Sequence, residues 1–323
     1  MKIGDLEVDV SRIGLGTWAI GGGPAFGNTD TEDIGVKTIR SALDVGVNLV
    51  DTAPGYNFGR SEEIVGTAIS GLREKYVLIT KCGLVWNAEG SYFNTVGETI
   101  LNRSLSPDSI KREVELSLTR LGTDYIDIYM THWPSIPPFE TPIADTVACL
   151  MELKESGVIR GIGAANVTPD QVKQYLDAGG LDIVQMRYGI LDRTVEAELM
   201  PLCIDNGITV QAYSPLEMGI LAGAVPRGYV PPTGSARAGK KWFEPKNLDK
   251  ALDMLDAWAP LRKKYDCSSA DLAIGWILAQ NENVCVLSGC TTPEELSSNV
   301  KAMTINLSDS DAVWMRDYAE KLG

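Results

Sequence analysis

Short apolar runs alternate along this chain with longer segments in which apolar residues recur every three or four positions. Most of the short runs are continuous apolar stretches, which is typical of parallel strands buried on both faces. We expect eight strands, at residues 12–15, 49–51, 76–81, 126–130, 160–164, 183–185, 209–213 and 284–288.

The segments between these runs carry the signals of helices. Ser106, Thr168 and Thr292 are each followed by proline, which places a hydroxyl at the N-cap and proline at the first helical position. An apolar stripe over residues 143–151 is stopped by Gly157. The pattern therefore predicts a helix after most of the strands.

Eight strands with intervening helices predict a (β/α)8 TIM barrel, formed as a single domain over residues 1–323. An open doubly wound sheet is the alternative. Residues 1–10 are expected to form a β-hairpin that closes the bottom of the barrel. Three long βα loops, at 82–105, 132–142 and 216–247, would emerge at the carboxyl ends of the strands, where the active sites of such barrels lie.

Charge and composition narrow the class of protein. The net charge of −14 repels phosphate backbones, so we expect no nucleic-acid partner. No apolar run reaches the roughly 18 residues of a membrane span, and residues 1–5 lack the apolar core of a signal peptide. We therefore expect a cytoplasmic protein with no membrane contact. The cysteines form no CxxC pair and His132 is the only histidine, so no metal site is expected. The sequence does not define the oligomeric state.

Polar side chains stand at the ends of three consecutive predicted strands. Asp51 ends the second strand, Lys81 ends the third, and His132 follows the fourth, while Tyr56 stands in the loop after Asp51. Neighbouring strands are about 4.8 Å apart, so the four side chains can meet at one point.

These four residues suit the reduction of a carbonyl group. Hydride arriving at a carbonyl carbon leaves an alkoxide that needs a proton, and Tyr56 could supply it. A free tyrosine has a pKa of about 10, which we expect Lys81 to lower by favouring the phenolate. Asp51 would orient Lys81, and His132 would donate a hydrogen bond to the substrate oxygen. Each residue also has a structural interpretation: an Asp51–Lys81 ion pair, a structural histidine and an ordinary loop tyrosine.

The pattern around these residues resembles the aldo-keto reductases, and the resemblance covers essentially the whole chain. Besides the tetrad it rests on Arg12-Ile-Gly-Leu-Gly-Thr, Leu121-Gly-Thr-Asp-Tyr-Ile-Asp, Ile162-Gly-Ala-Ala-Asn, Gln185, Tyr213-Ser-Pro-Leu and Ser288-Gly-Cys-Thr. It implies that Asp51, Tyr56, Lys81 and His132 form the catalytic tetrad, with Tyr56 as proton donor. The segments 16–24 and 51–59 are similar to those of bacterial members that reduce small ketoaldehydes.

The resemblance also implies a nicotinamide cofactor and its contacts. Asn166 and Gln185 would hold the carboxamide, and Tyr213 would stack on the nicotinamide ring. The pyrophosphate and the adenosine would lie against Ser214, Leu216, Gly219, Ser288, Gly289, Thr291, Ser298 and Asn299. Two alternatives are core packing for Tyr213 and hydrogen bonding at the barrel mouth for Asn166 and Gln185.

The preferred cofactor is predicted to be NADH, with NADPH possible. Members that prefer NADPH place Lys and Arg against the 2′-phosphate, whereas this chain has Gly289 and Glu295 at the matching positions. A carboxylate there would repel the phosphate and accept a hydrogen bond from a free 2′-hydroxyl. The alternative is that Glu295 only caps the helix that begins after Thr292.

Three tryptophans, Trp18, Trp86 and Trp133, follow predicted strands and are expected to wall a small apolar substrate pocket. Loop packing is the alternative. Such a pocket would favour small aldehydes and ketoaldehydes as the carbonyl substrate. The competing functions are an NAD(P)-dependent sugar or polyol dehydrogenase and a non-catalytic, nucleotide-sensing accessory subunit.

Overall fold

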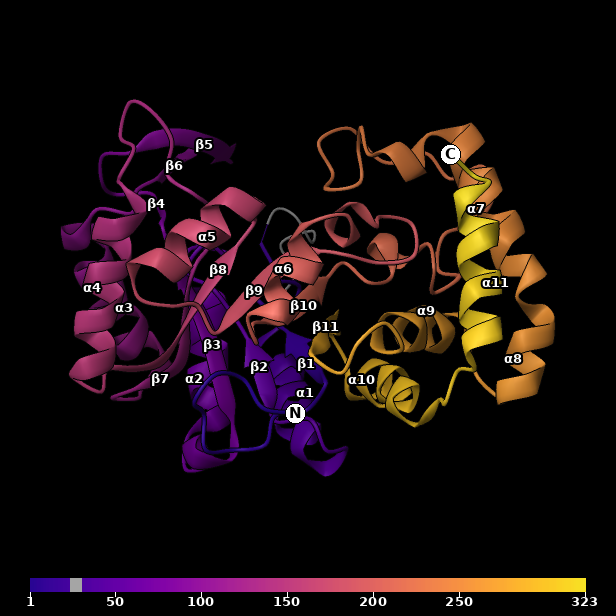
Figure 1. Cartoon of the computed structure of the whole chain (residues 1–323), viewed down its shortest axis with the longest axis horizontal. Coiled ribbons are helices and arrows are strands. Elements are labelled where there is room, and N and C mark those ends of the chain that lie inside the picture. The colour runs from indigo at the N-terminus through magenta and orange to yellow at the C-terminus, as the bar shows by residue number, and fades with distance from the viewer. Residues whose placement is uncertain (24–30) are drawn as a thin grey trace.

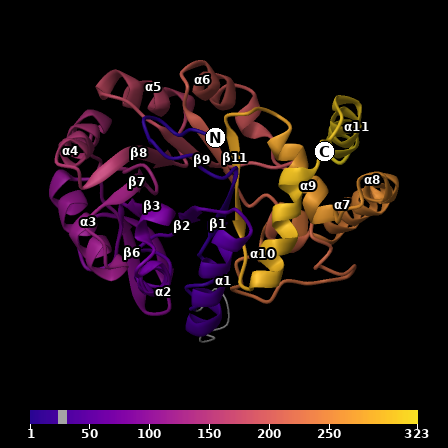
Figure 2. The same cartoon turned by 90° about the horizontal axis from the view of Figure 1, so that it is seen from below.

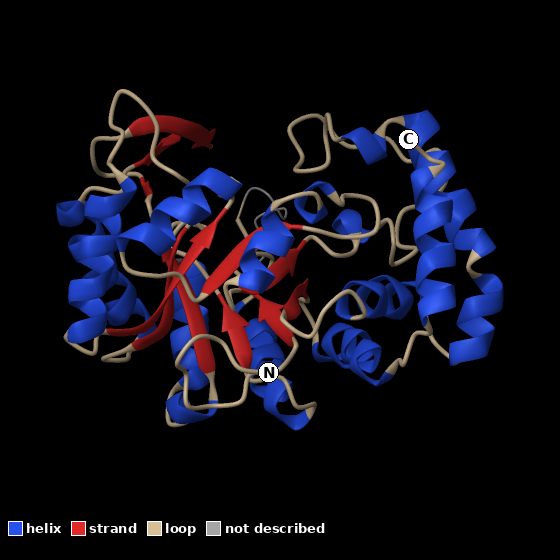
Figure 3. Cartoon of the chain, in the orientation of Figure 1, coloured by secondary structure: helices blue, strands red, loops and turns tan. Residues whose placement is uncertain are grey.

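Eight parallel strands close into a barrel, as predicted, and the open sheet is excluded. The computed structural model describes residues 1–23 and 31–323, so Pro24, the last residue of the motif at 16–24, lies outside the described residues. Figures 1 and 3 show the strands at the centre of the molecule. In order around the barrel they are β1 (Ile13–Gly16), β11 (Val284–Gly289), β10 (Thr209–Tyr213), β9 (Ile183–Arg187), β8 (Ile159–Ala165), β7 (Ile126–Thr131), β3 (Val77–Cys82) and β2 (Leu49–Asp51).

One helix of the ring around the barrel follows each strand (Figure 2), and all but the last of them return the chain to the amino end of the next strand. They are α1 (Glu32–Asp44), α2 (Arg60–Ile69), α3 (Pro107–Leu121), α4 (Ile143–Glu155), α5 (Pro169–Ala178), α6 (Leu199–Asp205), α9 (Ser269–Leu278) and α10 (Pro293–Val300). Three more helices, α7 (Pro245–Ala257), α8 (Ala259–Tyr265) and α11 (Asp309–Glu320), pack outside this ring. The predicted caps are confirmed, because the hydroxyls of Ser106, Thr168 and Thr292 accept the N3 amides of α3, α5 and α10.

The predicted N-terminal β-hairpin is wrong, because residues 1–10 form no strand. The buried residues Ile3, Leu6 and Val10 are spaced by three and four positions, not by two, so the segment cannot present one face as a strand would. It folds back through turns, with paired backbone hydrogen bonds between Met1 and Val10. Its apolar side chains pack against the barrel residues Leu49, Val77, Ile128 and Ile183. The segment therefore does plug the amino end of the barrel.

The long loop predicted at 82–105, after β3, contains a small antiparallel sheet. It consists of β4 (Leu84–Val85), β5 (Ser91–Val96) and β6 (Thr99–Arg103). The Ser91 hydroxyl accepts the amide of Phe139 at 3.1 Å, which ties this sheet to the loop at 132–142. Figure 1 shows the sheet and the loop at 216–247 above the carboxyl ends of the strands, on opposite sides of the mouth.

Candidate active site

Three members of the predicted tetrad meet at the carboxyl end of the barrel. Lys81 donates from Nζ to Asp51 Oδ1 at 2.6 Å, to the carbonyl oxygen of Thr52 at 3.0 Å and to the Tyr56 hydroxyl at 3.2 Å. Asp51 and Lys81 are fully buried. Asp51 and Lys81 come from the neighbouring strands β2 and β3. The loop that follows β2 then places the ring of Tyr56 against Lys81.

His132 completes the group through contact with the Tyr56 ring. The two ring centroids are 5.7 Å apart and the planes meet at 82°, so the imidazole stands edge-on to the phenol. The His132 amide donates to the carbonyl oxygen of Cys82 at 2.9 Å, and the side chain of Asn166 donates to the His132 carbonyl oxygen at 3.0 Å. The backbone of His132 is therefore fixed to both neighbouring strands.

Burial and the neighbouring charged groups together determine the charge states at this site. Burial lowers the pKa of Lys81, but Asp51 and Tyr56 more than offset this, so its pKa is raised and it stays an ammonium ion. Burial, together with the charge of Lys81, holds the pKa of His132 well below its ordinary value, so the imidazole is neutral near pH 7. A neutral imidazole can donate one hydrogen bond without carrying charge.

The expected lowering of the Tyr56 pKa is wrong for this structure. Burial raises the pKa of Tyr56 above its ordinary value, and the attraction of Lys81 offsets only part of that effect while Asp51 adds to it. The prediction counted the charge of Lys81 and could not count the desolvation of the phenol. Tyr56 is therefore held as the protonated phenol, which is the form that can donate.

A second set of polar side chains crosses the barrel interior to reach Asp51. Gln185 donates from Nε2 to Asp51 Oδ2 at 2.8 Å and to Gln211 Oε1 at 2.6 Å. Gln185 was predicted to hold a cofactor, and the observed bonds fit the alternative of hydrogen bonding at the mouth. Gln211 was missed, although a glutamine at the centre of the apolar run 209–213 is a signal that sequence analysis can detect.

Asn166 and Tyr213 are held together at the rim. The Tyr213 hydroxyl donates to Asn166 Oδ1 at 2.8 Å, across the end of β9. Asn166 and Ser214 have positive φ angles of 59° and 57°, an uncommon backbone that turns each chain sharply as it leaves its strand. The partly exposed ring of Tyr213 thus stands beside the side-chain amide of Asn166, and the neighbouring strand β9 carries the amide of Gln185. This combination fits a flat ring that carries a carboxamide.

The residues predicted for the rest of the cofactor lie at the end of β11, on α10 and in the loops that follow β10 and β11. Ser288 is buried and its hydroxyl accepts from Asn299 Nδ2 at 2.9 Å. Glu295 Oε2 accepts from the amide of Thr291 at 2.8 Å and from its hydroxyl at 2.9 Å. Glu295 therefore holds Thr291 in the loop before α10, not the Thr292 amide that a capping box would use, and its side chain remains exposed. Gly289 and Ser298 are exposed as well.

The predicted pyrophosphate loop begins at the end of β10. The amide of Gly219 donates to the carbonyl oxygen of Leu216 at 3.0 Å, and Gly219 has a φ of +99°. Arg237 donates to the carbonyl oxygen of Met218 at 2.7 Å, which ties the far part of the loop at 216–247 to this turn. The turn follows Ser214 directly, so it lies beside the rim formed by Tyr213.

The three tryptophans do not share one set of contacts. The Trp18 ring lies 6.2 Å from that of Tyr56 and is 45% exposed, so it stands at the site. Trp86 packs edge-on against Phe58 at 5.5 Å. Trp133 packs against Phe93 in β5 at 5.5 Å. The observed contacts of Trp86 and Trp133 are those of the loop-packing alternative.

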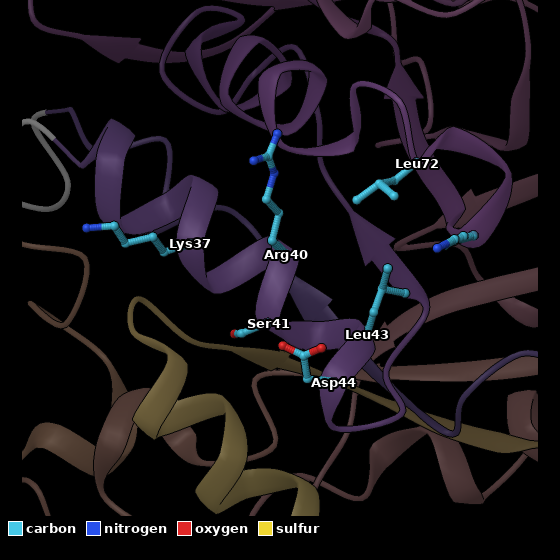
Figure 4. A pocket seen from close by; sticks show the side chains of 7 residues that line it. Lys37, Arg40, Ser41, Leu43, Asp44 and Leu72 are labelled. Carbon is cyan, nitrogen blue, oxygen red and sulfur yellow. The ribbon is translucent and has the colours of Figure 1, made fainter.

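A surface hollow of about 560 Å³ lies away from this site, between the outer face of α1 and the chain that follows α2 (Figure 4). One of its basic residues, Arg40, donates to the carbonyl oxygen of Ala68 at 3.0 Å and so binds the end of α2. None of the tetrad residues lines this hollow. Among the described residues no helix is long and apolar enough to cross a membrane, and no group of three potential ligands could hold a metal.

Comparison with known proteins gives one consistent result. The model of the aldo/keto reductase family matches residues 12–318. The NADH-specific methylglyoxal reductase of Escherichia coli (strain K12) is 56% identical over 323 residues, which are 100% of this chain and 98% of that protein. The solved glycerol dehydrogenase of Gluconobacter oxydans has a TM-score of 0.89 and 33% identity, with 99% of this chain and 94% of that chain covered.

A second similar structure was solved with a cofactor. It is an aldo-keto reductase from Klebsiella pneumoniae in complex with NADPH, with a TM-score of 0.72 and 26% identity, and the match covers 96% of this chain and 92% of that one. The barrel, the strand-end side chains and the length of these matches agree: the chain belongs to the aldo/keto reductase family.

Proposed function

We propose that this protein reduces small aldehydes and ketoaldehydes, methylglyoxal among them, to alcohols with NADH, and that Tyr56 is the proton donor. The observation that carries the proposal is the hydrogen-bonded cluster at the mouth of the barrel, in which Lys81 donates to both Asp51 and Tyr56. Membership of the family makes the chain an NAD(P)H-dependent oxidoreductase. The 56% identity to a methylglyoxal reductase supports the substrate class.

The chain's own residues account for the proton that the reaction needs. When bound, NADH supplies the hydride. Tyr56 then donates its phenolic proton to the substrate oxygen, and the phenolate left behind is stabilised by Lys81 at 3.2 Å. Asp51 keeps Lys81 charged and in place during this step. The neutral imidazole of His132 donates a hydrogen bond to the same substrate oxygen and so stabilises the developing charge.

The preference for NADH is supported by two observations. The Escherichia coli relative is NADH-specific. In this chain Glu295 is an exposed carboxylate, held beside Thr291 at the start of α10, where a 2′-phosphate would be repelled. The solved relative that contains NADPH shows that the family's fold also accepts the phosphorylated cofactor.

The first test is nicotinamide absorbance over time with purified protein, methylglyoxal and a panel of small aldehydes, with NADH and NADPH run in parallel. We expect NADH to be oxidised faster than NADPH. Faster use of NADPH would keep the reductase and contradict the cofactor assignment. Tight NADH binding without turnover of any aldehyde would contradict the proposal and favour the nucleotide-sensing accessory subunit.

One specific observation favours a second candidate, the oxidation of a polyol by NAD⁺. The glycerol dehydrogenase of Gluconobacter oxydans has the same fold at 33% identity over nearly the whole chain. The same residues serve both directions, because Tyr56 as phenolate can accept the proton that it donates in reduction. Glycerol and sugar alcohols with NAD⁺ therefore belong in the same assay, and turnover faster than that of any aldehyde would favour the dehydrogenase.

A further inference from the structure

A chain of three polar side chains spans the interior of the barrel. Asp51 on β2 accepts from Gln185 on β9, and Gln185 also donates to Gln211 on β10. β2 and β9 stand opposite each other in the closed order of strands, so this bond crosses the barrel. All three side chains are buried. Through Gln185, hydrogen bonds therefore connect the tetrad residue Asp51 to strands β9 and β10, beside which the nicotinamide ring would bind.

Gln185 is held so that one end of its amide stays available. Within the described residues both of its hydrogen bonds come from Nε2, which leaves its carbonyl oxygen to accept a bond from another group. Because β9, which carries Gln185, lies between the strands that lead to Asn166 and to Tyr213, a carboxamide NH₂ is the donor that fits. Asp51 is an acceptor and so requires the nitrogen of this amide, while Gln211 holds the second proton of the same Nε2. Without Gln211, the amide would keep only its bond to Asp51 and could tilt about it.

The side chain of Gln211 is unfavourable for the stability of the fold. It is fully buried, and its Nε2 has no hydrogen-bond partner among the described residues. A buried donor without an acceptor destabilises a fold, and an apolar side chain of the same shape would avoid that cost. The unpaired donor of Gln211 thus destabilises the fold, and the only hydrogen bond of its side chain among the described residues is the one that Oε1 accepts from Gln185 at 2.6 Å.

We propose that Gln211 is a positioning residue that fixes the orientation of Gln185, and thereby couples the carboxamide end of the cofactor site to Asp51 and the tetrad. The register of β10 and β9 places Gln211 directly beside Gln185, so the two side chains can bond without any change in the backbone. The inference rests on the proposed function, since it assumes that a nicotinamide carboxamide binds at Gln185.

The test is Gln211→Met, which keeps the length of the side chain and removes its amide. We expect the cofactor-free variant to melt at or above the temperature of the wild type, because the unpaired donor is gone. We expect NADH to bind about tenfold more weakly and kcat to fall by about tenfold or more. Thermal unfolding, fluorescence titration with NADH alone and steady-state assays measure the three effects separately.

The control is Cys285→Ala, because Cys285 is the fully buried neighbour of Gln211 on β11. It is expected to leave NADH affinity and kcat unchanged. In a Gln185→Met background the change at Gln211 should have no further effect on NADH affinity, since its action passes through Gln185. Gln211→Leu repeats the comparison with a different shape if the Met variant does not fold.

Two outcomes would overturn the proposal. One is unchanged NADH affinity and kcat in the Gln211→Met protein, whatever its melting temperature. The other is an equal loss of affinity with and without Gln185. Failure of the proposed function would look different, because the wild type would then fail to oxidise NADH with any aldehyde, while binding of NADH alone would still report on the coupling.

Discussion

The two ends of the barrel interior are built from opposite chemistry on the same strands. Toward the amino end the interior is filled by apolar side chains, among them Leu49, Val77 and Ile183. Two or four residues further along these strands, Asp51, Lys81 and Gln185 face the same interior. The alternation of strand residues is unchanged, and only the side-chain type switches.

Within one barrel, the amino end therefore contributes mainly to stability and the carboxyl end to the chemistry. Apolar side chains at the amino end gain free energy from burial without any partner. The charged and amide groups at the carboxyl end need partners for every polar atom, and Gln211 shows that one atom is left without. A substitution at one end of the barrel should therefore change one of the two properties and leave the other.

The largest expected effect is the loss of activity when Tyr56 is replaced by Phe. The change removes the proton donor and leaves the ring, so kcat should fall by about 10²- to 10⁴-fold while NADH affinity and stability stay near those of the wild type. Tyr92→Phe is the matched control, since Tyr92 is 63% exposed on β5. Turnover that survives in the Tyr56→Phe protein would eliminate Tyr56 as the donor.

The opposite result is expected at the amino end. Ile128 is fully buried in the apolar interior, and Ile128→Ala should lower the free energy of unfolding by about 2–5 kcal/mol because it leaves a cavity. The kcat of the folded protein should not change. Urea unfolding and steady-state kinetics on the same preparation give both numbers, with Val313→Ala on α11, 54% exposed, as a control for the loss of methyl groups alone. A fall in kcat that matches the fall in stability would show that the two ends are not separate.

These two regions also differ in how far the sequence predicts them. The eight strands follow from their apolar runs, and the meeting of Asp51, Lys81 and His132 follows from the parallel strand ends. The sheet of β5 and β6 carries a weaker signal, the Gly97-Glu98 turn, with Gly97 at a φ of +61°. The bond from Gln211 to Gln185 and the raised pKa of Tyr56 depend on side-chain direction and on burial by the finished mouth, which no local pattern contains.

A third prediction concerns a buried carboxylate near the mouth that the proposed chemistry does not use. Glu113 on α3 accepts the amide of Gly83 at 2.9 Å and the hydroxyl of Ser109 at 3.0 Å. Burial raises the pKa of Glu113 to about 7, against opposing contributions from these two donors and Arg112, while the charge of Glu62 adds to it. The folded state therefore holds this proton more tightly than the unfolded chain does.

The sign of the pH effect follows from that difference. Between about pH 4.5 and 7 the folded state binds more protons than the unfolded state, so stability should fall as pH rises, by about 3 kcal/mol in all from this group. Glu113→Gln stays neutral and should lose this slope, so it gains stability over the wild type at about pH 8 and not at about pH 4.5. Urea unfolding of both proteins at the two pH values measures it, and parallel pH profiles would contradict the raised pKa.

The smallest expected effect is a change of cofactor preference at the rim. Replacing Gly289 by Lys and Glu295 by Arg in one protein places two cations beside the position expected for a 2′-phosphate, where Glu295 now holds Thr291. The ratio of kcat/KM for NADPH to that for NADH should rise by about tenfold, or about 1.4 kcal/mol. The Glu295→Gln variant separates the two roles of this residue, because an amide can still accept from Thr291 but no longer repels phosphate. If Glu295 only caps α10, Glu295→Gln will leave the ratio unchanged and the double variant will lose activity with both cofactors alike.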